Sequence, residues 1–197
     1  MKAGIQRVII TDPVSGRGAW RFEKSKLRYP AANKVYRETF AISGMPLLPG
    51  YEEIRCTQAE FVAGYDHELG IDVVLNFESG ICATLQEKFL YTTYRTVTVE
   101  YEQNWRTGEF GDWFNMKAQY YFVGYDRNDS RSFDEWILLD WPAAARLTAM
   151  GQLRWQERRN KRDGARASFK YLNFAAFPDS AVVAVHMHGV AEGHDPP

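Results

Sequence analysis

The sequence predicts an α/β or α+β domain built on a central mixed β-sheet flanked by helices. A β-branched run at 71–77 is closed by Ser79-Gly80, and a second strand-like run follows at 81–90. Together they predict a hairpin. Segment 120–125 is apolar or aromatic at almost every position, which is typical of a strand buried on both faces of such a sheet. Apolar residues at helical spacing before and after these strands indicate the covering helices.

Helices are predicted at 51–65 and from Asp140 to about Lys161. In the first segment, apolar residues recur at helical spacing among glutamates and glutamines. In the second, Asp140 is a suitable N-cap and Pro142 falls within the first helical turn. We expect both helices to pack against the sheet.

Further strands are predicted by short runs of β-branched and aromatic residues. They cover residues 7–10, 19–22, 35–42, 96–101, 135–139, 168–174 and 181–188. We therefore expect the N-terminal segment 1–50 and the C-terminal segment 164–197 to be β-rich additions to a core of about 52–163. Because no internal repeat or linker is evident, residues 1–197 are expected to form a single domain.

The composition restricts the function classes. With 24 Lys and Arg against 25 Asp and Glu, the net charge is −1, so the overall basic excess of a non-specific nucleic-acid binder is absent. Any nucleic-acid contact must come from a local basic patch. No apolar run approaches the roughly 20 residues that span a bilayer, and the first residues lack signal-peptide features. We expect a cytoplasmic protein without membrane contact, in which Cys56 and Cys82 are reduced core thiols.

Asp72 and the run Gln86-Glu87-Lys88 carry the candidate chemistry. Strand alternation places Gln86 and Lys88 on one face and Glu87 on the other. Asp72 lies on the neighbouring strand of the predicted hairpin, where it interrupts a run of branched aliphatic residues. A carboxylate buried there needs a cation or hydrogen-bond donors. We expect a divalent metal ion or Lys88 to be that partner.

The complete motif consists of two stretches, Gly70-Ile71-Asp72-Val73-Val74-Leu75 and Thr84-Leu85-Gln86-Glu87-Lys88-Phe89. It resembles the PD-(D/E)XK nuclease superfamily, in a Gln-x-Lys variant. The resemblance covers about residues 52–140 and implies a restriction-endonuclease-like core. It also implies that Asp72 and Gln86 bind a catalytic Mg²⁺ or Mn²⁺ ion, and that Lys88 positions or activates the attacking water.

Gln86 stands where Asp or Glu is usual in this superfamily. Its carbonyl oxygen can bind Mg²⁺ or Mn²⁺ but carries no negative charge. Many members have an acidic residue on the helix before the first strand, so Glu60 is the candidate for a further catalytic and metal-binding carboxylate. Glu100 is a second candidate, and Glu87 would replace Gln86 if a β-bulge shifted the register.

A basic run towards the end of the second predicted helix is the candidate nucleic-acid-binding patch. It comprises Arg154, Arg158, Arg159, Lys161 and Arg162. On a helix, spacings of three and four would place Arg154, Arg158 and either Lys161 or Arg162 along one side, where they could follow a phosphate backbone. A solvated helix face is the alternative interpretation.

The sequence thus predicts a Mg²⁺- or Mn²⁺-dependent endo- or exodeoxyribonuclease that hydrolyses phosphodiester bonds, with DNA as the expected partner. The metal would polarise the phosphate and lower the pKa of a bound water, and Lys88 would orient hydroxide or stabilise the transition state. The alternative is a catalytically inactive nucleic-acid-binding or assembly subunit with the same fold, because Gln86 leaves the site short of charge. A homodimer would suit cleavage of both DNA strands, although no sequence feature indicates one.

Overall fold

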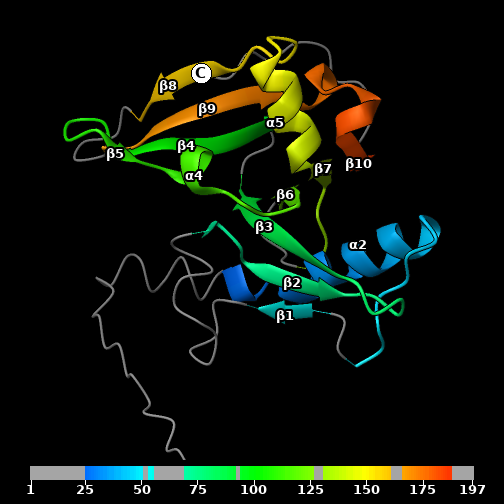
Figure 1. Cartoon of the computed structure of the whole chain (residues 1–197). Helices are drawn as coiled ribbons and strands as arrows, with labels where there is room; N and C mark the ends of the chain where they lie inside the picture. Colours follow the sequence, from blue (N-terminus) through cyan, green and yellow to red (C-terminus); the bar gives the residue numbers. More distant parts are fainter. Residues whose placement is uncertain are drawn as a thin grey trace, which may run out of the picture.

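The protein has an α+β fold with two β-sheets and few helices (Figure 1). The computed structural model describes residues 25–50, 53–55, 69–91, 94–126, 131–160 and 166–187. The strands predicted at 7–10 and 19–22 lie outside the described residues. No helix in the described ranges is long and apolar enough to cross a membrane.

The larger sheet has six strands in the order β1-β2-β3-β6-β7-β10. Their bounds are β1 (Glu53–Arg55), β2 (Val73–Asn76), β3 (Cys82–Leu90), β6 (Tyr120–Tyr125), β7 (Glu135–Asp140) and β10 (Val182–His186). β3 and β6 are parallel, and the other neighbours are antiparallel. The mixed sheet expected from the sequence is therefore confirmed, with the predicted hairpin formed by β2 and β3.

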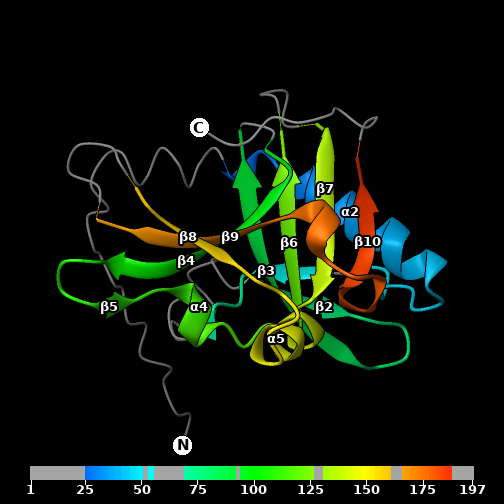
Figure 2. The same ribbon diagram turned by 90° about the horizontal axis from the view of Figure 1, so that it is seen from above.

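The smaller sheet has four strands in the order β5-β4-β9-β8, all antiparallel. Their bounds are β4 (Thr96–Asn104), β5 (Glu109–Phe110), β8 (Gln156–Arg159) and β9 (Ser168–Asn173). β4 and β5 belong to the connection between β3 and β6. The strands of this sheet run across those of the larger sheet when the molecule is viewed from above (Figure 2).

Helices cover the sheets from different sides. The helices are α2 (Tyr29–Ile42), α4 (Asp112–Asn115) and α5 (Trp141–Ala149), with short 3₁₀ turns η1 (Phe174–Ala176) and η2 (Asp179–Ala181). α2 lies against one face of the six-stranded sheet, and α5 and the four-stranded sheet lie on the other side (Figures 1 and 2). The six-stranded sheet is thus the middle layer of the fold.

The strand predicted at 35–42 is wrong, because these residues belong to helix α2. Pro30 lies in its first turn, where the missing N–H costs nothing. Ala32, Tyr36 and Phe40 recur every fourth residue and are fully buried against the sheet. The β-branched and aromatic residues in this segment favour a strand locally, but the buried stripe at helical spacing decides the structure.

Both predicted helices also need correction. Glu53–Arg55 forms the edge strand β1 instead of helix, and the rest of the predicted segment 51–65 lies outside the described part of the chain. α5 begins as expected, since the Asp140 carboxylate accepts a hydrogen bond from the Ala143 N–H at 2.8 Å. It ends at Ala149, and Gly151 then has a φ of 72°, a left-handed conformation that favours glycine and ends helices.

The N-terminal segment is not β-rich where the structure describes it, whereas the described part of the C-terminal segment is β-rich as expected. The described part of 1–50 is mainly helix α2. β10, from the C-terminal segment, is an edge strand of the six-stranded sheet, and β9 is an internal strand of the smaller sheet. The other predicted strands, including 96–101, 120–125 and 135–139, are confirmed within one to three residues at their ends.

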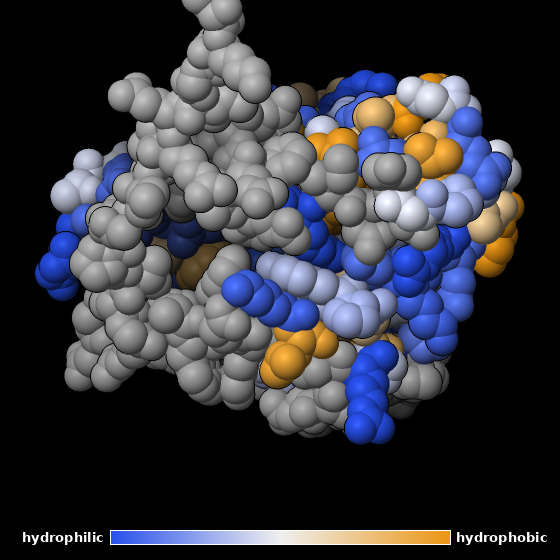
Figure 3. All heavy atoms as spheres, turned by 90° about the horizontal axis from the view of Figure 1, so that it is seen from below, coloured by the Kyte–Doolittle hydropathy of each residue, from blue (hydrophilic) through white to orange (hydrophobic). Residues whose placement is uncertain are grey.

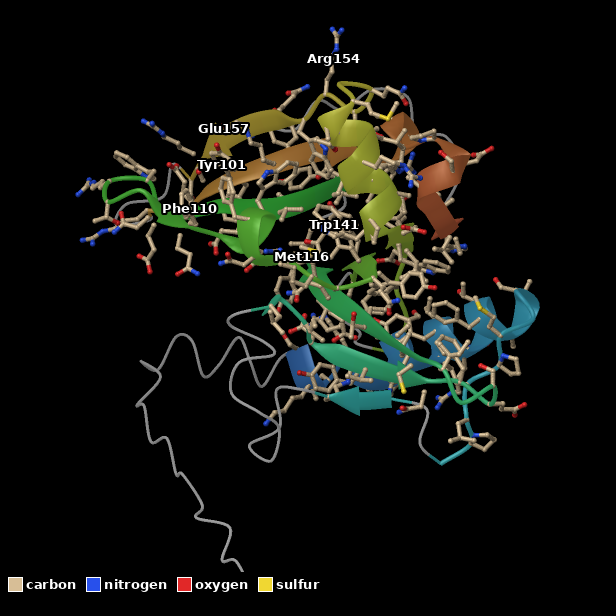
Figure 4. The ribbon with its side chains drawn as sticks, viewed as in Figure 1. Tyr101, Phe110, Met116, Trp141, Arg154 and Glu157 are labelled. Atoms are coloured by element: carbon tan, nitrogen blue, oxygen red, sulfur yellow. The ribbon has the colours of Figure 1, made fainter. Side chains whose placement is uncertain are left out.

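Two hydrophobic clusters lie on opposite faces of the six-stranded sheet. One joins α2 to the sheet through residues such as Phe40, Leu75 and Phe122. The other fills the space beneath the smaller sheet and α5, where Met116 and Trp141 lie (Figure 4). Cys82, expected in the core, is instead exposed, and its thiol lies 3.2 Å from the Asn76 side-chain oxygen. Cys56 lies outside the described residues.

The outer surface is mixed in polarity. Exposed apolar side chains of the described residues include Leu27, Ile42 and Met150. On the face seen from below, hydrophobic and hydrophilic residues are interspersed (Figure 3). This face gives no indication of a single extended apolar patch among the residues that the structure describes.

Two tyrosine hydroxyls join the smaller sheet to the larger one. The Tyr121 hydroxyl donates to the Thr98 carbonyl at 2.7 Å, and the Tyr125 hydroxyl donates to the Thr96 carbonyl at 2.7 Å. The Thr96 N–H lies 3.2 Å from the Tyr125 oxygen. Both tyrosines point from β6 towards β4, so the backbone edge of β4 rests on the face of the larger sheet. Burial raises the pKa of both tyrosines, which therefore remain protonated donors at neutral pH.

Replacing Tyr125 by Phe should destabilise the fold by about 1–3 kcal/mol, because the buried Thr96 carbonyl loses its donor. Urea unfolding followed by circular dichroism measures this change. Tyr94→Phe, at an exposed tyrosine, is the control and should change stability by less than about 0.5 kcal/mol. Equal effects of the two substitutions would contradict the role given to the Tyr125 hydroxyl.

Candidate functional site

Asp72 lies immediately before β2 and is tied to β3 at two points. Its N–H donates to the Leu85 carbonyl at 2.9 Å, and its carboxylate Oδ2 accepts from the Glu87 N–H at 2.7 Å. The register pairs Val73 with Leu85, and because the Asp72 N–H also donates to the Leu85 carbonyl, the regular pairing ends at this point. Asp72 is thus held beside Leu85 and Glu87, the two residues that flank Gln86.

β3 alternates as the sequence pattern predicts. Leu85 and Phe89 pack in the cluster beneath α2, and Glu87 also reaches that side. Gln86 and Lys88 therefore face the smaller sheet. In the parallel register with β6, Gln86 is paired with Tyr121 and Lys88 with Val123, with no shift along the strand. Gln86 and Tyr121 thus form a row on the face that the smaller sheet covers, and Asp72 lies beside Gln86 at the start of β2.

Glu87, the alternative to Gln86, is not part of this row, because its side chain reaches the α2 side of the sheet. Its carboxylate accepts from the Tyr36 hydroxyl at 2.7 Å and forms an ion pair with Arg55. Arg55 also donates to the Asn33 side-chain oxygen at 2.5 Å and lies 3.8 Å from the centre of the Tyr29 ring. This buried network faces α2, on the other side of the sheet from Gln86.

Opposing charges stabilise this network. Burial, followed by the Glu87 carboxylate, raises the pKa of Tyr36 well above its usual range, so the hydroxyl stays a donor. Burial is the largest single influence on Arg55 and lowers its pKa. Glu87, Tyr36 and Tyr29 together outweigh burial, so the pKa of Arg55 is raised. The side chains of Arg55 and Glu87 are 5% and 4% exposed, so the pair is almost completely removed from water. Its role is structural.

The side-chain oxygen of Gln86 is unsatisfied among the residues that the structure describes. This Oε1 atom is buried and none of those residues forms a hydrogen bond with it. A buried carbonyl oxygen without a partner costs about 1–3 kcal/mol, and such atoms are uncommon in native structures. A bound cation or water would remove this cost. Gln86 is therefore the member of the row that has coordination capacity left for a ligand.

Glu100, on β4, is the carboxylate that the structure places beside Lys88. It is about half-buried, and burial raises its pKa above the usual 4.5. The Lys88 ammonium lowers this pKa, while Asp112 and Glu109 raise it. Glu100 was the second of the two carboxylates expected from the sequence. The first, Glu60, lies outside the described residues.

Asp112, at the start of α4, is a neighbour that the sequence did not indicate. A Cβ atom on Gly111 would lie 2.6 Å from the Glu100 carbonyl oxygen, so only glycine permits this close approach of the chain to β4. Asp112 follows directly, and its charge raises the pKa of Glu100. After burial, the charges of Asp112 and Asp72 also raise the pKa of Tyr121. Glu100 acts on Tyr121 in the same direction, so three carboxylates contribute to its raised pKa.

These oxygen atoms provide the kind of ligand that Mg²⁺ and Mn²⁺ prefer. Within the ranges that the structure describes, no three His, Cys, Asp or Glu side chains form a group that could hold a metal ion. The oxygen donors at this position are instead the Asp72 carboxylate and the Gln86 amide oxygen, with Glu100 and Asp112 nearby. These residues fit a weakly held cation with oxygen ligands, for which Gln86 supplies the oxygen that no other described residue uses.

The basic run does not form the helical patch that the sequence predicted. Arg158 and Arg159 lie on strand β8, so they point to opposite faces of the smaller sheet. Arg154 lies in the turn before it, is exposed, and points away from the body of the molecule (Figure 4). Lys161 and Arg162 lie outside the described residues. The three described arginines therefore do not share a side.

Comparison with models of known protein families, with curated proteins and with solved structures finds no match. The arrangement of the described residues is thus the basis for any statement about function.

Replacing Glu100 by Gln should stabilise the metal-free protein at neutral pH. The raised pKa means that the folded state disfavours the charged carboxylate, so its stabilising neutral form is lost as pH rises through the folded pKa. With allowance for solvent at this half-buried group, we expect a gain on the order of 0.5 kcal/mol at pH 7. This gain should vanish below the unfolded pKa of about 4.3.

Urea unfolding at pH 4 and pH 7 checks this sign. Glu78→Gln, at an exposed position in the turn between β2 and β3, is the matched control and should behave like the wild type at both values. A Glu100→Gln protein that is less stable than the wild type at pH 7 would contradict the inferred cost of a buried charge at Glu100.

Proposed function

We propose that the protein is a Mg²⁺- or Mn²⁺-dependent nuclease that hydrolyses phosphodiester bonds, with DNA as its substrate. The observation that supports this most strongly is the position of Gln86 beside Asp72, with a buried Oε1 that has no hydrogen-bond partner among the described residues. Lys88 follows on the same face of β3, and its charge acts on Glu100. An anionic oxygen, a neutral oxygen and an ammonium are thus brought together by two adjacent strands.

The surrounding fold is compatible with the resemblance to the PD-(D/E)XK superfamily. The motif lies on an antiparallel strand pair, and the second strand is followed in the sheet by a parallel strand, β6, that is buried except at Tyr120. The sheet is mixed and has a helix against one face. We infer a restriction-endonuclease-like core, in which the connection from β3 to β6 is elaborated by β4, β5 and α4.

The charge balance supports a cation at this position. Three carboxylates raise the pKa of Tyr121, namely those of Asp72, Glu100 and Asp112. The Lys88 ammonium lowers the pKa of Glu100. Because these groups are partly removed from water, their mutual repulsion is poorly screened. A divalent cation would offset it.

Each residue has a distinct task in this proposal. Asp72 and Gln86 would hold the cation, and Glu100 would supply the additional charge that Gln86 lacks. When bound, the metal polarises the phosphate and lowers the pKa of a coordinated water. The Glu87 N–H holds the Asp72 carboxylate in place through the 2.7 Å hydrogen bond. Lys88 would bind the attacking hydroxide or a phosphate oxygen and stabilise the negative charge of the transition state.

Cleavage of supercoiled plasmid and end-labelled linear DNA with Mg²⁺ or Mn²⁺ tests the assignment. Asp72→Asn and Lys88→Met should each lower the cleavage rate by about 100-fold or more, because each removes a charge at the reacting phosphate. Asp179→Asn and Lys117→Met, at exposed positions, are the matched controls and should cleave at the wild-type rate. Metal-dependent cleavage that persists in Asp72→Asn would sink the site assignment.

Gln86→Glu tests the metal site without relying on activity. The added carboxylate should raise Mn²⁺ affinity by about ten-fold or more, because it supplies the charge that the amide lacks. Without metal this variant should be less stable than the wild type, since it places a second carboxylate near that of Asp72, and Mn²⁺ should restore its Tm. Calorimetric titration and thermal unfolding measure both effects. A destabilised Gln86→Glu protein whose Tm does not respond to Mn²⁺ would exclude a cation here.

A non-catalytic nucleic-acid-binding subunit is the second candidate function. It is favoured by the neutral Gln86 and by the lack, among the described residues, of a group of three metal-binding side chains. Binding of DNA without cleavage in any divalent cation, together with unchanged binding by Asp72→Asn, would select this function over the nuclease.

A further inference from the structure

Phe169, on β9, is an aromatic residue that packs in neither hydrophobic cluster of the described residues. It is only partly buried. The Lys88 ammonium lies over its ring, 5.7 Å from the ring centre. An aromatic side chain outside the core and beside a cation is not explained by packing of this sheet.

Phe169 lies in the middle of a row across the smaller sheet. The registers pair it with Glu100 on β4 and with Arg158 on β8, so the three side chains share one face. Tyr171, two residues along β9, lies on the same face and is also partly exposed. Its hydroxyl donates to the Gln156 side-chain oxygen at 2.5 Å. This face, defined by Phe169, Tyr171 and Arg158, is called the aromatic face below.

The aromatic face adjoins the candidate site. Glu100 of the candidate site lies next to Phe169 in the smaller sheet, and Lys88 contacts the Phe169 ring from the larger sheet. Lys88 and Arg158 have no ion-pair partner among the described residues, whereas Lys170, on the opposite face, is paired with Glu157 at 2.8 Å. Two cations available for anionic groups, Lys88 and Arg158, therefore lie beside one partly exposed aromatic ring.

We propose that the aromatic face binds a single-stranded segment of the nucleic acid, with one base stacked on Phe169 and the adjacent phosphates bound by Lys88 and Arg158. The inference rests on the proposed function for the identity of the ligand, and it names the substrate class: a single strand or an unpaired end. Bases stack on aromatic side chains only when they are unpaired or splayed out, which excludes the interior of a duplex.

The opposite face of the same sheet is less suited to binding nucleic acid. Arg159 points to that face and lies 4.8 Å from the centre of the Trp105 ring, and Lys170 lies 4.1 Å from the centre of the Tyr101 ring. The cations there are already stacked on aromatic rings or paired with Glu157. The two successive arginines of β8 thus have different roles, although the sequence does not distinguish them.

Fluorescence anisotropy with labelled oligothymidine, measured at low salt with divalent cations chelated, tests the proposal independently of cleavage. Arg158→Ala and Phe169→Ala should each weaken Kd by about ten-fold, which is ~1.4 kcal/mol. Arg159→Ala on the opposite face and Phe110→Ala, at an exposed aromatic residue on β5, should change Kd by less than about two-fold. A duplex of the same length should bind more weakly than the single strand.

Phe169→Leu separates loss of stacking from loss of folding. It retains apolar volume without an aromatic ring, so its Tm should stay close to the wild type while its Kd rises as in Phe169→Ala. Equal losses in Arg158→Ala and Arg159→Ala, wild-type affinity in Phe169→Leu, or a preference for the duplex would each overturn the inference. Failure of the nuclease proposal is seen separately, as absence of cleavage by a protein that still binds oligothymidine with this pattern.

Discussion

The ion pair between Arg55 and Glu87 fixes which way β3 faces, and the candidate site depends on that orientation. Side chains alternate along a strand, so a slip of one residue would turn Glu87 towards the smaller sheet and leave Arg55 as an uncompensated buried charge. With Tyr36 also bonded to Glu87, the cost of such a slip is several kcal/mol. The structural network on the α2 side therefore holds Gln86 and Lys88 on the other side, and the Glu87 N–H in reach of Asp72.

The smaller sheet encloses the site because it meets the larger one through the edge of β4. The hydroxyls of Tyr121 and Tyr125 satisfy carbonyl groups that an unpaired edge would leave without donors. The same contact removes water from Glu100 and brings Asp112 near it across Gly111. The resulting concentration of negative charge lowers stability locally, which is a common property of sites that bind a charged ligand.

The parts of the fold that were predictable from sequence are those where local pattern and burial agree. β3 and β6 show the strand pattern in nearly every residue, and Asp140 marks the start of α5. β8 was predicted as helix because its charged residues fit a solvated helix face as well as an edge strand. Asp72, Gln86 and Lys88 could be paired because they lie on adjacent strands of one hairpin. Asp112 could not, since it reaches Glu100 only through the long connection from β3 to β6 and the close approach at Gly111.

That long connection also determines the order in which the protein can assemble. β4 lies between β3 and β6 in the sequence, yet its main partner, β9, comes much later, as shown by the hydrogen bond between Ser168 and Glu102, 66 positions apart. Such distant pairing slows folding and leaves the β4 edge without a neighbour while the chain emerges from the ribosome. The strands of the larger sheet other than β10 can therefore form first around α2, with the charged residues of β3 still open to water. Closure by β9 comes after them, so a partly synthesised chain would hold Asp72 and Gln86 in place without the enclosure that shifts the pKa of Glu100.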